Sequence, residues 1–292
     1  MKSTWYAALV FGAGACYGVL STCVKLAYTQ GFGVADVSGA QYFYGMTLLW
    51  LAVLWKVRSG FSKKTILQFL LIGLPMAMTT IFYYESLETL SASMAVVFLF
   101  QSIWMGSLVE CIRNHKRPSL LRCVSVAMAL GGTALAAGLV GGGEAFHFEI
   151  GIIWGLLAAF SYTTEIVCLN TLGRDVPPLC KSALMASGAA IFTFFLLPPV
   201  FLESTTRFLE LAPFGMVLGL FGVALPPYLL STGMPHVSPG LGSLLAASEL
   251  PVALLLSFVI LGESISIMQG AGILLILVGI FLGNHGQVAG GQ

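Results

Sequence analysis

Residues 237–282 read VSPGLGSLLAASELPVALLLSFVILGESISIMQGAGILLILVGIFL. Two long apolar runs begin in this stretch, at about residues 238–260 and 269–285, with a short polar break around LGES between them. An α-helix needs about 20 apolar residues to cross roughly 30 Å of hydrocarbon. We therefore predict that each run crosses a membrane.

The whole chain repeats this pattern of apolar runs and short polar breaks. Hydrophobic residues make up 58% of its 292 residues and charged residues 9%, with a mean hydropathy of +0.94, whereas a soluble domain carries roughly 25% charged residues. The predicted spans are 5–28, 38–57, 65–87, 91–112, 118–139, 150–171, 179–202, 212–233, 238–260 and 269–285. Only Glu88 and Thr89 interrupt the apolar stretch between the third and fourth spans, but a single helix there would be far too long. We predict an all-α membrane protein with ten transmembrane helices.

Positive charge indicates the orientation, because cytoplasmic loops are rich in Lys and Arg. With the N-terminus in the cytoplasm, 11 basic residues fall on the cytoplasmic side and two, Lys25 and Arg207, fall on the outer side. The cytoplasmic set is Lys2, Lys56, Arg58, Lys63, Lys64, Arg113, Lys116, Arg117, Arg122, Arg174 and Lys181. We predict a multi-pass protein of the plasma (inner) membrane with both termini cytoplasmic.

The two halves of the chain share one plan. A shift of 147 residues places LSASM (90–94) over VSPGL (237–241), and ALGGTALAAG (129–138) over ILVGIFLGNH (276–285), so that Gly132 meets Gly279. Five spans per unit is an odd number, so the second unit must be inverted relative to the first. The predicted units are residues 1–145 and 146–292. Inverted repeats are a common architecture of secondary transporters, which bind substrate near the midplane between the halves.

Three stretches resemble a known family: ACYGVLSTCVKLA (15–27), FYYESLETLSASMAVVFLFQ (82–101) and residues 237–282, within which SELPV and LGE are the most specific parts. They are similar to the drug/metabolite transporter superfamily, specifically its EamA-type ten-helix members. The resemblance implies a central cavity shared by two halves, no cofactor, and transport of amino acids, nucleotide sugars, quaternary amines or drugs. Many relatives carry an Arg where this chain has Gln41, Tyr42 and Phe43, so a substrate that depends on that Arg does not carry over.

Carboxylates at membrane depth are candidates for function, because each costs at least about 2.5–3.5 kcal/mol to insert. Glu249 comes 11 residues after Ser238, roughly 16 Å into the ninth span, and precedes Pro251, which can kink a helix. Glu165 lies in the sixth span, three residues after Tyr162 and hence on the same face. A carboxylate beside an aromatic ring suits a cation. The alternatives are a structural carboxylic acid at Glu249 and a snorkelling acid at Glu165.

Further candidates lie on the first and fourth spans. Tyr17 lies near the midplane, and Ser21 shares its face four residues later. Gln101 is the one amide on an apolar face of the fourth span, and Trp104 follows it by one turn. Each of these residues either lines a binding pocket or packs against a neighbouring helix with its polar group satisfied.

The third span ends in the aromatic and acidic sequence FYYESLE (82–88). Glu85 is predicted at the outer boundary, so Tyr83, Tyr84 and Trp104 fit an aromatic belt at the membrane interface. An outer vestibule for an amine is the alternative. Tyr42 and Tyr83 complete the predicted substrate-binding set, together with Tyr17, Ser21, Gln101, Trp104, Tyr162, Glu165 and Glu249.

The acidic lining favours a secondary carrier of a small amine-bearing solute, either an amino acid or an organic cation such as a quaternary amine. No G-x-x-x-x-G-K-[ST] motif is present, so transport would run on gradients or exchange. A membrane-embedded enzyme fits less well, because His115, His147, His236 and His285 all fall in loops or at helix ends. A non-transporting sensor or subunit is the remaining alternative. We predict no catalytic or metal-binding residue. As partners we expect a small-molecule substrate and the lipid bilayer, no nucleic acid, and a monomeric or homodimeric state.

Overall fold

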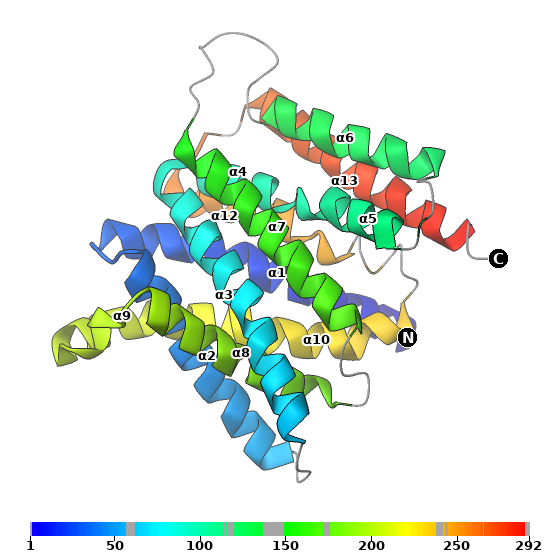
Figure 1. Cartoon of the computed structure of the whole chain (residues 1–292). Helices are drawn as coiled ribbons and strands as arrows, with labels where there is room; N and C mark the ends of the chain where they lie inside the picture. The colour runs from blue at the N-terminus through cyan, green and yellow to red at the C-terminus, as the bar shows by residue number, and fades with distance from the viewer. Residues whose placement is uncertain are drawn as a thin grey trace.

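The computed structural model describes residues 2–56, 62–113, 115, 119–136, 149–171, 176–237, 242, 245–264 and 266–289, which form a bundle of helices (Figure 1). In the first half of the chain these are α1 (Lys2–Thr29), α2 (Val34–Lys56), α3 (Lys63–Thr89), α4 (Ala92–Leu99), α5 (Ser102–Arg113) and α6 (Leu120–Ala136). The second half holds α7 (Ile150–Thr171), α8 (Pro178–Leu196), η1 (Val200–Leu202), α9 (Thr205–Leu218), η2 (Gly219–Ala224), α10 (Leu225–Gly233), η3 (Met234–His236), α12 (Glu249–Leu256), η4 (Ser257–Leu261) and α13 (Ile267–Ala289). Both η2 and η4 are π-helical, and η1 and η3 are 3₁₀ helices.

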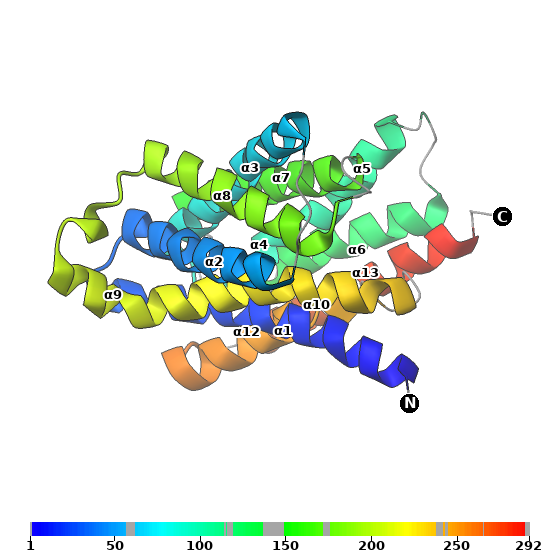
Figure 2. The same ribbon diagram turned by 90° about the horizontal axis from the view of Figure 1, so that it is seen from below.

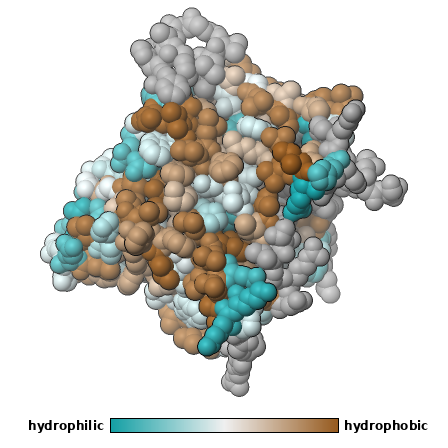
Figure 3. All heavy atoms as spheres, viewed as in Figure 1, coloured by the Kyte–Doolittle hydropathy of each residue, from teal (hydrophilic) through white to brown (hydrophobic). Residues whose placement is uncertain are grey.

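Described helices account for all ten predicted spans. Seven are long and apolar enough to cross a membrane, and three apolar helices are shorter, namely Leu120–Ala136, Glu249–Leu261 and Ile267–Leu282. Large apolar side chains point outward: Trp55, Phe195 and Ile267 are 88%, 83% and 93% exposed. Figure 3 shows apolar residues over much of the face in view, with the most hydrophilic residues near its edges. Such a surface is stable in lipid rather than in water. The prediction of an all-α, ten-span membrane protein is confirmed.

The seventh and eighth spans have other bounds than predicted. The seventh ends at Leu196 instead of residue 202, because Pro198 and Pro199 follow and proline cannot continue a helix. The eighth begins at Thr205 instead of residue 212, where the Ser204 hydroxyl accepts a hydrogen bond from a backbone N–H and caps the helix. Helix α9 therefore extends through residues that were predicted to form a loop.

Some predictions lie outside the described residues. These are the boundary between residues 145 and 146, the start of the ninth span at residue 238, and the basic residues Arg58, Lys116, Arg117 and Arg174. Within the described part, α1 begins and α13 ends on the same side of the bundle (Figures 1 and 2). Both ends of the chain thus approach the same face of the bundle.

The fourth and ninth spans are broken near their middle, which the sequence did not predict. The fourth span divides into α4 and α5 at a turn over residues 100–101, and a turn over residues 247–248 precedes α12. At each break, backbone N–H groups donate to carbonyls three residues back instead of four. The pairs in the first half are Gln101 to Phe98 (3.1 Å) and Ile103 to Phe100 (3.2 Å), and those in the second half are Ser248 to Leu245 (3.1 Å) and Leu250 to Ala247 (3.1 Å).

These hydrogen bonds match under the 147-residue shift, because 101 + 147 = 248 and 103 + 147 = 250. The two breaks are therefore one feature of the repeated unit. In membrane proteins, such non-helical backbone is tolerated where it is buried in protein or lines a cavity.

Contacts between α6 and α13 show that the repeats are inverted. Ser125 on α6 donates to the Gly279 carbonyl on α13 at 2.6 Å. Gly132, later on α6, lies against Gly272, earlier on α13, so the two helices run antiparallel. Under the 147-residue shift, Ser125 corresponds to Gly272 (125 + 147 = 272) and Gly132 corresponds to Gly279 (132 + 147 = 279). The contact of Ser125 with Gly279 is therefore equivalent to the contact of Gly272 with Gly132. Figure 1 shows α6 and α13 side by side at one edge of the bundle.

Glycines let helices of opposite repeats cross at close range. A Cβ added to Gly73 on α3 would lie 2.7 Å from the Gly188 Cα on α8, and one added to Gly188 would overlap the Leu70 backbone. On the other side, a Cβ on Gly219 of η2 would lie 2.6 Å from the Gly45 backbone nitrogen on α2. Small residues permit such close backbone contact between helices in a membrane. Close packing therefore joins the two repeats along both crossings.

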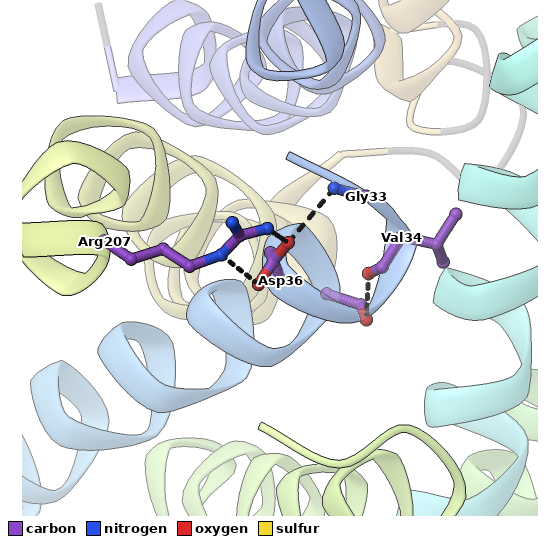
Figure 4. Close-up of polar contacts among 5 residues, drawn as sticks. Gly33, Val34, Asp36 and Arg207 are labelled. Atoms are coloured by element: carbon purple, nitrogen blue, oxygen red, sulfur yellow. Dashed lines mark hydrogen bonds and ion pairs between the residues drawn. The ribbon is translucent and has the colours of Figure 1, made fainter. Parts of the chain in front are cut away.

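An ion pair also joins the repeats at the end of the bundle where α2 and α9 begin (Figure 4). Arg207 Nη2 and Nε lie 2.6 and 3.2 Å from the two carboxylate oxygens of Asp36, a bidentate geometry that strengthens such pairs. The Gly33 backbone N–H donates to the same carboxylate at 3.2 Å, and the Arg207 guanidinium lies 5.5 Å from the centre of the Phe32 ring. The Asp36 side chain is only 7% exposed, compared with 41% for Arg207.

Replacing Arg207 is expected to destabilise the protein. The Arg207→Ala variant would leave a buried carboxylate with the Gly33 N–H as its hydrogen-bond donor, a cost of about 1–3 kcal/mol. We expect a lower melting temperature in detergent. The double variant Arg207→Ala/Asp36→Asn should recover part of the loss, because it removes the buried charge. A double variant less stable than Arg207→Ala would contradict this role of the ion pair.

Candidate functional site

A cavity of about 370 Å³ lies between the two repeats. Its described lining comprises Gly14, Tyr17, Leu20, Gln41, Met76, Thr79, Thr80, Tyr83, Tyr84, Leu99, Phe100, Ser102, Ile103, Tyr162, Glu165, Ile166, Gly222, Leu230, Met234, Ala246, Ala247, Glu249 and Ile280. Residues next to both helix breaks contribute to the wall. The broken fourth and ninth spans thus meet at the cavity, as expected for irregular backbone within a membrane.

The cavity has an acidic and aromatic wall. Glu165 and Glu249 supply two carboxylates, and Tyr17, Tyr83, Tyr84 and Tyr162 supply four phenol rings. Among the described residues of the wall there is no Lys, Arg, His or Asp. Tyr17, Tyr162 and the two glutamates, four of the predicted residues, thus lie together in one wall. Such a wall attracts cations through the carboxylate charge and the faces of the rings.

Glu249 is placed differently from its prediction in the middle of a long helix. It is the first residue of α12, directly after the turn over residues 247–248. Pro251 therefore lies in the first helical turn, where the backbone N–H that proline lacks would have no partner in the helix. Pro251 was expected to kink the ninth span. The structure instead breaks the span completely, one turn before Pro251. As the first residue of α12, Glu249 lies at the positive end of that helix's dipole, which favours a negative charge.

Tyr83 and Tyr84 do not form an interfacial belt. They are 6% and 0% exposed, and both contact the cavity. The Tyr28 hydroxyl on α1 donates to the Tyr84 carbonyl at 2.8 Å, which ties the end of α1 to α3. The belt prediction was wrong because it rested on depth along the helix alone. Helix α3 turns this pair of rings toward the protein interior instead of toward lipid.

Tyr42 and Ser21 belong to the predicted set but do not line the cavity. The Tyr42 hydroxyl donates to the Met76 carbonyl at 2.9 Å and lies 2.5 Å from the Thr80 hydroxyl, so Tyr42 packs α2 against α3. Ser21 is 0% exposed. The structure places both side chains behind the wall.

Gln101 and Trp104 support the break in the fourth span. The turn at residues 100–101 diverts the Gln101 backbone N–H to Phe98, and the Gln101 side-chain amide donates to the Val97 carbonyl instead, at 3.1 Å. The same amide nitrogen lies 2.5 Å from the Thr133 hydroxyl on α6. Trp104 Nε1 donates to the Gln101 carbonyl oxygen at 2.9 Å. All hydrogen-bonding groups of this pair have protein partners, and neither residue is in the wall.

The sequence analysis missed several polar residues of the wall. Gln41, Thr79, Thr80 and Tyr84 line the cavity. Many relatives carry an Arg where this chain has Gln41, Tyr42 and Phe43, which pointed to this part of α2. Tyr42 was predicted to bind substrate, whereas the structure places its neighbour Gln41 in the wall. Successive residues of a helix point about 100° apart, because an α-helix has 3.6 residues per turn. A choice one residue away therefore faces another side of the helix.

The cavity extends toward one end of the bundle. Leu230 and Met234, near the end of α10, belong to its wall, as does Gly14 in the first half of α1. At the opposite end, polar contacts hold separate elements together. Besides the Asp36 ion pair, the Glu263 carboxylate accepts a hydrogen bond from the Ala92 N–H at 2.8 Å and thereby joins the η4–α13 loop to the start of α4. In the described residues, no group of three or more His, Cys, Asp or Glu could hold a metal ion.

A membrane bundle of two inverted repeats around a central cavity is the architecture of a secondary transporter. A model of the EamA-like transporter family matches residues 4–138 and again residues 149–284. The chain belongs to this family, and so to the drug/metabolite transporter superfamily. Members of the family are membrane transporters of small solutes and not enzymes.

Solved structures support the fold. Twenty-five of their chains match. One, described as "Crystal structure of protein", has a TM-score of 0.64 and 19% sequence identity over 94% of this chain and 97% of its own. Similarity at this level concerns the fold alone. No curated protein matches the sequence.

Proposed function

We propose that the protein is a secondary carrier of a small amine-bearing solute, an amino acid or an organic cation such as a quaternary amine. The observation that carries the proposal is the wall of the cavity, where Glu165 and Glu249 lie among four tyrosines without a basic side chain among the described residues. An anionic substrate such as a nucleotide sugar would face two carboxylates there. A cation gains both the charge attraction and the ring contacts.

The same wall favours an organic cation over a zwitterionic amino acid. The carboxylate of an amino acid would lie in a buried space with two glutamates and no described Lys or Arg to pair with it. Burying an unpaired charge costs several kcal/mol. A quaternary or protonated amine without a carboxylate has no such cost.

Alternating access would follow from movement of one repeat against the other. The glycine crossings Gly73–Gly188 and Gly45–Gly219 join the repeats through backbone contacts that leave few side chains to obstruct sliding. The cavity extends toward the end where α1 begins, which is the cytoplasmic end if both termini are cytoplasmic in the plasma membrane. The state described here would then face inward.

Counterflow in liposomes tests the proposal. Purified protein would be reconstituted with unlabelled solute inside and the same labelled solute outside, for choline, tetramethylammonium, leucine and, as an anionic control, glucose-6-phosphate. We expect counterflow for the cations and none for the phosphate. Absence of counterflow for every amine would contradict the proposal and favour a non-transporting sensor or subunit.

A further inference from the structure

The amide of Gln41 is held in one orientation at the wall of the cavity. The Tyr84 hydroxyl donates to Gln41 Oε1, and Tyr84 itself is 0% exposed and is tied to α1 through its carbonyl. With Oε1 accepting from Tyr84, the other end of the amide must be Nε2, a donor of two hydrogen bonds. No described residue accepts a hydrogen bond from Nε2. Gln41 is only 3% exposed, so what exposure it has is to the cavity that it lines.

A glycine packs closely against the amide. Gly222, in the π-helical segment η2, also lines the cavity, and a Cβ added there would lie 3.0 Å from Gln41 Nε2. Any side chain at this position would press on the amide nitrogen. Segments of π-helix are often found at functional sites, because they change which residues face inward. The glycine thus lets the Gln41 amide occupy its place in the wall.

An oxygen of the substrate that accepts from Nε2 would add one hydrogen bond, worth about 0.5–1.5 kcal/mol net. We propose that Gln41 is a specificity-determining residue. Its Nε2 donates to an oxygen of the substrate, and Tyr84 is the positioning residue that holds the amide. Together with the two glutamates, this assigns the substrate to cations that carry a hydroxyl or carbonyl oxygen besides the amine. The inference rests on the proposed function, because the amine is bound by the carboxylates.

Two probes that share one cationic group test the inference. Choline and tetramethylammonium are both quaternary amines, but only choline has an oxygen. We expect Gln41→Leu, which keeps the side chain's size and removes the donor, to weaken choline binding about tenfold, the effect of losing one hydrogen bond, and to leave tetramethylammonium binding unchanged within about twofold. Binding would be measured by calorimetry on purified full-length protein in detergent.

Tyr84→Phe provides a second test with Gln41 in place. We expect the preference for choline over tetramethylammonium to fall, because the amide loses its orienting partner. Tyr42→Phe is the control, since it removes the hydroxyl of another buried tyrosine whose own side chain is not part of the wall, although its partners Met76 and Thr80 are. It should leave the preference unchanged. Should Gln41→Leu not fold, the comparison of Tyr84→Phe with Tyr42→Phe decides alone.

The outcomes separate this inference from the function on which it depends. If wild-type protein binds both probes and Gln41→Leu and Tyr84→Phe leave their ratio unchanged, the role of Gln41 is refuted and the amine carrier stands. An equal loss of both probes in the folded Gln41→Leu variant likewise refutes selection by oxygen. If wild-type protein binds neither probe, the proposed function fails and this inference fails with it.

Discussion

Replacing Glu165 by Gln is expected to abolish amine transport and to leave the protein folded. The substitution keeps the shape of the side chain and removes the charge that the substrate's amine would contact in the cavity. Interactions with a charged partner contribute about 1.5–3 kcal/mol, so transport at low substrate concentration should fall roughly a hundredfold. The measurement is initial uptake of labelled choline into liposomes.

The control for Glu165→Gln is Glu88→Gln, which makes the same chemical change on an exposed side chain at the end of α3. We expect wild-type uptake from it. Glu249→Gln should reduce uptake as Glu165→Gln does, because both carboxylates line the cavity. Uptake by Glu165→Gln at the wild-type rate would remove that residue from the site.

A single methyl group at Gly188 is expected to destabilise the whole bundle. The Cβ of Gly188→Ala would overlap the Leu70 backbone on α3, 2.8 Å from the Leu70 Cα, and a helix backbone cannot give way as a flexible side chain can. We expect a loss of about 3 kcal/mol, the upper part of the range for overpacking. A lower melting temperature in detergent would be accompanied by poor recovery of folded protein.

Gly106→Ala is the matched control for this crossing. Gly106 lies within α5, and a Cβ there meets no atom within 4 Å. The variant should be neutral or more stable by about 0.5–1 kcal/mol, because glycine in a helix loses more conformational entropy on folding than alanine. Equal melting temperatures for Gly188→Ala and Gly106→Ala would contradict the close crossing of α3 and α8.

Features that depend on averages over many residues could be predicted from the sequence. Runs of apolar residues located the ten spans, because the hydrocarbon thickness fixes their length. The 147-residue shift was visible in short matches such as Gly132 with Gly279, and the structure confirms it in the reciprocal contacts of α6 with α13. Charge at depth pointed to Glu165 and Glu249, and the structure places both in one wall.

Features that depend on a single turn or on one residue's direction could not be predicted. The breaks at residues 100–101 and 247–248 fall at polar pairs, Gln101–Ser102 and Ser248–Glu249, which are too short to end a predicted span in the hydropathy pattern. Gln101 was predicted to bind substrate because it is the one amide on its helix face. Its amide instead donates to the Val97 carbonyl, which lacks a helical partner only because the helix is broken there. Tyr42 and Gln41 are adjacent, and only the packing of α2 against α3 decides which of them faces the cavity.

The acidic character of the cavity is the central claim, and thiol labelling measures it directly. Thr79 lines the cavity, so Thr79→Cys in a variant whose six natural cysteines are replaced by alanine would place one thiol there. Its modification rates with a cationic and with an anionic methanethiosulfonate would each be divided by the rate for a free thiol in solution. The account predicts a much larger normalised rate for the cationic reagent, reduced by added choline. Equal normalised rates, or a faster anionic reagent, would contradict it.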